Sequence, residues 1–99
     1  MMDKSQILST IESNKGTIKG FGVNKLGLFG SMARNDQTDN SDLDFVVSFS
    51  KGKKSYNNYI ELCYFLEELF HTKVDLLTFE SLEGSIKKRI LSEVENLEL

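Results

Sequence analysis

The chain has 99 residues, a formal net charge of −3 and one cysteine, Cys63. This length predicts a single domain over residues 1–99. The acidic balance argues against electrostatic binding to nucleic acid, and no run of about 18 apolar residues is present to span a membrane. One cysteine cannot form an internal disulfide, and the N-terminus lacks a secretion signal, so we expect a reducing cytoplasm.

The first half of the chain predicts a helix, a strand, a short helix and a second strand. Apolar residues at helical spacing predict an opening helix over residues 3–19, and the apolar run 23–30 predicts the first strand. Residues 31–34 begin a short helix that leads into a polar loop. Residues 42–49 are rich in β-branched and aromatic side chains, which is typical of a strand.

The second half predicts a helix, a strand and a final helix. Apolar residues recur at helical spacing over 55–71, and residues 73–79 predict the third strand. After Gly84, residues 85–97 predict a last helix, with these apolar side chains facing inward: Ile86, Ile90, Leu91 and Val94. The order α-β-α-β-α-β-α indicates an α+β fold with a three-stranded mixed sheet covered by helices.

Three aspartates fall on the predicted second and third strands. Asp42 and Asp44 share one face of a strand, because side chains alternate. Asp75 is the acidic residue inside the third strand and joins them if the two strands are neighbours. Two carboxylates about 5 Å apart repel by about 3 kcal/mol at an effective dielectric of 20. Either one of them stays protonated, or a divalent cation lies between them.

The aspartates and a preceding Gly-Ser turn together indicate a nucleotide site. Carboxylate ligation selects Mg²⁺, or Mn²⁺, and Mg²⁺ usually completes its shell with water and substrate phosphates. Gly30 permits close approach of a ligand, and the amides and hydroxyl at Ser31 can hold phosphate oxygens. Arg34 can reach the same anion. Each fragment alone is better explained by a turn, whereas the combination predicts a site for a nucleoside triphosphate. A structural ion pair is the alternative role for Arg34.

The segment "GSMARNDQTDNSDLDFVV", residues 30–47, resembles the minimal nucleotidyltransferases (MNT proteins) of the polymerase-beta-type superfamily. Their usual motif is Gly-Ser-x-Ala-Arg-Gly followed by Ser-Asp-hydrophobic-Asp. The resemblance covers about half the chain and implies a polymerase-beta-like fold. It implies Mg²⁺ held by the catalytic carboxylates, and ATP bound by the Gly-Ser turn and neighbouring residues. The implied metal ligands are Asp42, Asp44 and Asp75, and the nucleotide-binding residues are Gly30, Ser31, Arg34 and Ser41.

The resemblance also implies a function. MNT proteins are often paired with a HEPN-domain RNase toxin, act as its antitoxin and can transfer AMP to a tyrosine of that toxin. Asp75 is then the candidate to help deprotonate the acceptor. Asn35 replaces the usual glycine after Arg34, and Asn tolerates a positive φ well, so we expect a changed loop and an intact site.

Two alternatives stay open at this point. One is a non-catalytic antitoxin that neutralises a HEPN toxin by binding and has a vestigial or regulatory nucleotide site. The other is a nucleotidyltransferase acting on a small molecule or RNA, which the short chain and its acidity disfavour. The sequence leaves the acceptor, the preferred base and a homo-oligomeric state undetermined.

Overall fold

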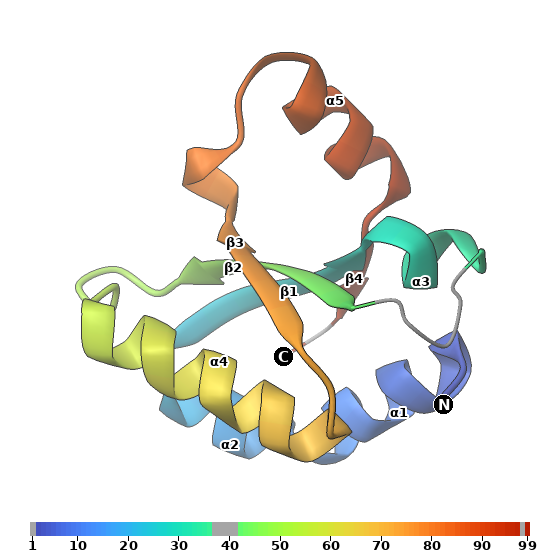
Figure 1. Ribbon diagram of the computed structural model, residues 1–99. Coiled ribbons are helices and arrows are strands. Elements are labelled where there is room, and N and C mark those ends of the chain that lie inside the picture. The colour runs from blue at the N-terminus through green and yellow to red at the C-terminus, as the bar shows by residue number, and fades with distance from the viewer. Residues whose placement is uncertain (1, 37–41, 98) are drawn as a thin grey trace.

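The computed structural model describes residues 2–36, 42–97 and 99. Figure 1 shows their arrangement, in which helices and strands alternate along most of the chain. The elements in chain order are α1 (Lys4–Ser13), α2 (Lys15–Gly20), β1 (Val23–Phe29), α3 (Gly30–Arg34), β2 (Leu43–Phe49), α4 (Tyr56–Phe70), β3 (Val74–Thr78), the 3₁₀ turn η1 (Phe79–Ser81), α5 (Gly84–Glu93) and β4 (Glu95–Leu97).

Within the described part of the chain, the strands form one four-stranded sheet in the order β3-β2-β1-β4. β2 and β3 run parallel, while β1 is antiparallel to both β2 and β4. The expected α+β fold with a mixed sheet is therefore confirmed, but the expected count of three strands is wrong. The fourth strand forms because residues 95–97 pair with the edge of β1 that β2 leaves uncovered.

The last helix is shorter than the sequence predicted. It ends at Glu93, and Val94 adopts an extended conformation (φ −67°, ψ 134°) that turns the chain back toward the sheet. Residues 94–97 contain neither glycine nor proline, so no local residue type signals the end of the helix. Pairing with β1 and packing of Val94 replace the helical hydrogen bonds that residues 94–97 would have made.

The opening helix is also divided in two. Asp3 begins α1 with a capping box, in which its side chain accepts from the Gln6 amide and the Gln6 side chain accepts from the Asp3 amide. Asn14 (φ −115°, ψ 14°) then ends α1 and begins α2, so the expected single helix over 3–19 is wrong. Both helices still bury the apolar residues that suggested them, Ile7 and Ile11 on α1 and Ile18 on α2.

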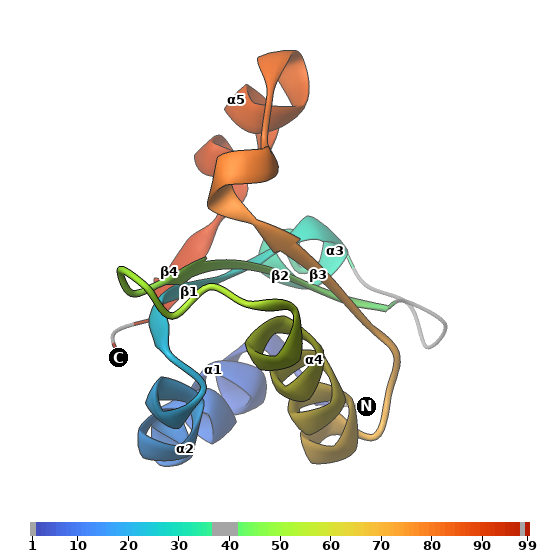
Figure 2. The same cartoon turned by 90° about the vertical axis from the view of Figure 1, so that its left-hand side faces the viewer.

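The main core lies between one face of the sheet and α1, α2 and α4, which Figure 2 shows on the same side of the strands. Alternate strand residues point into it, as the period of two requires. Its fully buried members include Leu26, Leu28, Phe45, Val47, Leu62 and Leu66. The predicted helix over 55–71 is confirmed as α4, which supplies the last two.

α5 lies on the opposite side of the sheet (Figure 2). A second, smaller core forms there from Phe29, Val46, Leu82 and Ile90, all buried, with Val94 partly buried against it. The expectation that four apolar residues of the last helix face inward is wrong for two of them: Ile86 is 56% exposed and Leu91 46% exposed. In the described ranges, no helix is long and apolar enough to cross a membrane.

Candidate active site

Asp44 and Asp75 stand side by side on the sheet face that carries α5. They are register partners in the parallel pair of β2 and β3. Their strand neighbours, such as Leu43 and Val74, are buried in the core under the other face. Alternation therefore turns both carboxylates away from that core. The expectation that the second and third strands are neighbours is confirmed, and Asp75 lies beside Asp44, whereas Asp42 precedes the first residue of β2.

Burial, together with acidic neighbours, changes the ionisation of Asp44. Burial raises the pKa of the Asp44 carboxyl to about 6, and the charge of Asp75, a hydrogen bond to Asp75 and the charge of Asp42 act in the same direction. Arg34 opposes them weakly by lowering this pKa. The three aspartates thus interact electrostatically, as their spacing predicted, with Asp44 at the centre.

Gly30 brings the Gly-Ser turn against these carboxylates. It is buried and has a φ of 77°, a conformation that glycine adopts without strain. A Cβ atom at this position would lie 2.2 Å from Oδ2 of Asp44. A side chain at position 30 would therefore displace the carboxylate, and only glycine lets α3 begin beside it. The two sequence motifs meet at one place.

Arg34 is held at the other end of α3 by two acidic side chains. Its Nη1 donates to Oε2 of Glu93 at 3.0 Å, and its Nε donates to Oδ2 of Asp36 at 3.1 Å. Both hydrogen bonds raise the pKa of the Arg34 guanidinium, and the bond to Glu93 has the larger effect. The ion-pair role that the sequence left open for Arg34 is therefore present in this structure, and the predicted phosphate contact stays a prediction.

Glu93 is the site residue that sequence reasoning missed. Its Oε1 accepts from the Gly30 amide at 3.1 Å, while its Oε2 accepts from Arg34. It arrives from the last residue of α5, 63 positions from Gly30. One signal was available: an acidic residue at the C-terminal end of a helix opposes the helix dipole, so it needs a compensating partner.

Three further residues near the predicted site in the sequence are Asn35, Ser31 and Ser41. Asn35 adopts the left-handed conformation (φ 61°, ψ 30°) that asparagine tolerates, and the intact site expected beside it stays a prediction. Ser31 lies half-buried in the first turn of α3, which leaves its role as a phosphate ligand a prediction. Ser41, predicted to bind the nucleotide, lies outside the described residues.

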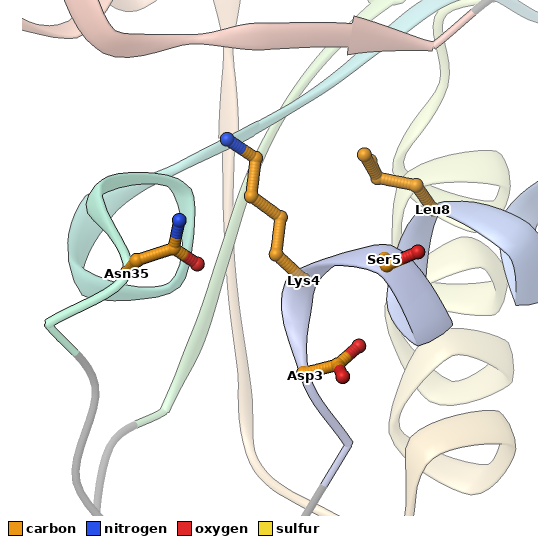
Figure 3. Close-up of a pocket in the computed structure, with 5 residues that line it drawn as sticks. All are labelled: Asp3, Lys4, Ser5, Leu8 and Asn35. Carbon is orange, nitrogen blue, oxygen red and sulfur yellow. The ribbon is translucent and has the colours of Figure 1, made fainter.

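A separate pocket of about 400 Å³ lies between the start of α1 and the end of α3 (Figure 3). It is lined by Asp3, Lys4, Ser5, Leu8 and Asn35. The Lys4 ammonium donates to the Ala33 carbonyl at 3.1 Å and pairs with Glu95 of β4 at 2.7 Å. This lysine joins α1, α3 and β4, and neither Asp44 nor Asp75 lines the pocket.

The donor set fits a hard divalent cation in its chemistry. Asp44 and Asp75 offer adjacent carboxylate oxygens, the ligands that Mg²⁺ and Mn²⁺ prefer. The pKa of Asp44 is raised first by burial and then by the charge of Asp75 and Asp42, and a bound cation would neutralise that charge. Among residues 2–36, 42–97 and 99, no group of three His, Cys, Asp or Glu side chains is arranged to hold a metal ion. The metal site with all three aspartates as ligands therefore stays a prediction.

Comparison with known proteins identifies the family. A model of the nucleotidyltransferase domain matches residues 5–96. The chain belongs to this nucleotidyltransferase family. It is similar to protein adenylyltransferase MntA of Thermococcus cleftensis, with 36% identity over 95 residues that cover 95% of each chain. It is also 44% identical over 72 residues to MJ0435 of Methanocaldococcus jannaschii, provisionally named a protein adenylyltransferase, covering 73% of this chain and 76% of that protein.

Solved structures show the same fold. A provisionally assigned minimal nucleotidyltransferase superposes with a TM-score of 0.81 at 26% identity, covering 95% of both chains. The MNT antitoxin complex with a tri-AMPylated HEPN toxin of Shewanella oneidensis gives a TM-score of 0.58 at 18% identity, covering 88% of this chain and 71% of the other. The predicted family, enzyme class and minimal nucleotidyltransferase fold are thereby confirmed.

Proposed function

We propose that this nucleotidyltransferase transfers AMP from ATP to a protein hydroxyl, with a tyrosine of a HEPN-domain toxin as the acceptor. The observation that carries the proposal is the adjacent pair Asp44 and Asp75, packed against the glycine turn of α3. Relatives named protein adenylyltransferases support the reaction, and a fold neighbour bound to a HEPN toxin supports the partner. The single cysteine, Cys63, agrees with a cytoplasmic location.

Most residues of the proposed site bind the nucleotide or the metal ion. Gly30, Ser31 and Arg34 bind the triphosphate through backbone amides, a hydroxyl and a guanidinium, with Ser41 as a further ligand. Asp42, Asp44 and Asp75 would hold Mg²⁺ or Mn²⁺, which would supply positive charge to the α-phosphate and the departing pyrophosphate.

Asp75 is the carboxylate best placed to accept the proton of the attacking hydroxyl. Asp75 is exposed, whereas Asp44 is half-buried, so an acceptor from another protein can reach Asp75 more easily. The hydroxyl oxygen forms a bond to the α-phosphorus, the bond from that phosphorus to the β-phosphate bridge breaks, and pyrophosphate leaves. Arg34 stabilises the negative charge that develops on the phosphates.

The experiment uses ATP labelled at either the α- or the γ-phosphate, with Mg²⁺ and a purified HEPN-domain toxin from the same organism. We expect α-label, and not γ-label, on the partner. In D44N and D75N, transfer falls by about a hundredfold or more. D3N is the matched control, because Asn replaces the N-cap aspartate of α1 well and Asp3 lies outside the carboxylate pair.

The second candidate is an antitoxin that neutralises its toxin by binding alone. Glu93 favours it, since this carboxylate already holds the Gly30 amide and Arg34, two groups that a triphosphate needs. A tight complex without label on either protein would support binding alone and overturn the transfer reaction.

A further inference from the structure

Glu93 makes two charge-assisted contacts with the predicted triphosphate-binding turn. Its two carboxylate oxygens are divided between the Gly30 amide (3.1 Å) and Nη1 of Arg34 (3.0 Å), so one carboxylate spans the whole of α3. The Glu93 side chain is 12% exposed, whereas that of Arg34 is 45% exposed. The carboxylate is thus packed into the site, and it is not a surface group that happens to meet an arginine.

These contacts use the groups that a polyphosphate would use. A carboxylate and a phosphate both present negatively charged oxygens to N–H donors, and each N–H donor binds one strong acceptor at a time. Glu93 also adds negative charge beside Gly30, whose α-carbon already adjoins the Asp44 carboxylate. Triphosphate oxygens at Gly30 and Arg34 would therefore be repelled by Glu93 as well as excluded by it.

We propose that Glu93 is a built-in competitor of the triphosphate, and that nucleotide binding releases its carboxylate from Gly30 and Arg34. This inference rests on the proposed nucleotide site and adds a regulatory contact to it. Glu93 is the last residue of α5, followed directly by Val94 of the second core and by β4. Its release consequently removes the direct hydrogen bonds from α3 to the end of α5, while Lys4 still bridges α3 and Glu95 of β4, and nucleotide occupancy is transmitted to the C-terminal residues.

The test measures binding of Mg²⁺–ATP, and of inorganic tripolyphosphate with Mg²⁺, to the wild-type chain and to E93Q. Gln keeps the size and can still accept from Gly30, but it loses the charge that holds Arg34. Because hydrogen bonds to charged groups are stronger than neutral ones, we expect the dissociation constants of both ligands to fall by about tenfold. E83Q is the matched control: the same charge is removed at the exposed first end of α5, and affinity stays unchanged.

A second measurement follows hydrogen exchange of the amides in residues 94–97. In the wild-type chain, ATP increases their exchange, and in E93Q exchange is already raised without ATP and rises no further. E93A serves as a second variant, with thermal unfolding to confirm that each protein is folded. Equal or weaker nucleotide binding by both E93Q and E93A would overturn the competitor and make Glu93 a residue that positions Arg34.

The outcomes separate this inference from the proposed function. Tighter binding by E93Q without AMP transfer to the partner supports the competitor and overturns the transfer reaction. AMP transfer by the wild-type chain with no gain in affinity for either E93Q or E93A overturns the competitor alone. Absence of ATP and tripolyphosphate binding to every variant overturns both.

Discussion

The two faces of the sheet differ in what covers them: one is covered by a large apolar core, and the other carries a smaller core and charged groups. The face under α1, α2 and α4 is a continuous apolar core in which strand and helix residues are fully buried. The opposite face has the small core beneath α5 at one part and the carboxylates of Asp44 and Asp75 at another. The first face carries most of the stability, which leaves the second free to hold groups that repel one another, at a cost in stability that functional sites commonly show.

The largest expected difference between the faces comes from shortening a leucine on each. L66A removes a fully buried side chain from α4 and should lower the free energy of unfolding by about 2–5 kcal/mol. L91A removes a side chain of α5 that is 46% exposed, and should cost about 1 kcal/mol or less. Urea unfolding of both variants measures the contrast. Similar losses would mean that α5 is as important to stability as α4.

A methyl group on Gly30 tests the contact between the two motifs. G30A combines an unfavourable positive φ with displacement of the Asp44 carboxylate, so we expect a loss of about 2–3 kcal/mol and loss of Mg²⁺–ATP binding. The matched control is G52A, because Gly52 also has a φ of 77° but an added Cβ there has no heavy atom within 4 Å. G52A should cost about 1 kcal/mol and leave ATP binding intact. Equal effects of the two variants would remove the argument for close contact with Asp44.

The carboxylate cluster should give the protein an unusual pH dependence. The pKa of Asp44 is about 6 in the folded chain against 3.8 as its ordinary value. Between these pH values the folded state binds more protons than the unfolded state, so this group makes stability fall as pH rises from about 4 to about 6. The half-exposed position reduces the effect to about 1–2 kcal/mol, after solvent screening is allowed for.

D44N should remove that part of the pH dependence and should be more stable than the wild-type chain at pH 7, because the ionised carboxyl no longer has to be accommodated. Urea unfolding between pH 4 and pH 8 measures both effects. Added Mg²⁺ should stabilise the wild-type chain more than D44N at pH 7. If the free energy of unfolding of the wild-type chain rises through this pH range in parallel with that of D44N, the raised pKa of Asp44 is contradicted.

The smallest effect is expected at the ion pair that joins the N-terminal helix to β4. Lys4 and Glu95 are 2.7 Å apart, with side chains 22% and 47% exposed. E95Q should lower the free energy of unfolding by about 0.5 kcal/mol and less in high salt. A much larger loss would show that β4 depends on this pair for its place in the sheet.

Local sequence was sufficient to predict structure where a residue pattern is compatible with only one local conformation. Alternating apolar residues put Phe45 in the core and Asp44 on the other face, because strand side chains alternate whatever the surroundings. The helical spacing of residues 55–71 predicted α4 nearly to the residue. The Gly-Ser and Asp-x-Asp spacing predicted that the two motifs meet, and Asn35 marked a position with positive φ.

Tertiary structure decided the features that depend on distant partners. β4 exists because β1 has an edge to pair with, and nothing within residues 95–97 distinguishes them from the end of an amphipathic helix. Glu93 meets Gly30 only because that pairing turns the chain back across α3, which brings residues 63 positions apart into hydrogen-bonding distance. Local patterns thus determined which side chains form the core and the acidic cluster, while the pairing of β4 with β1 brought the Glu93 carboxylate to Gly30 and Arg34.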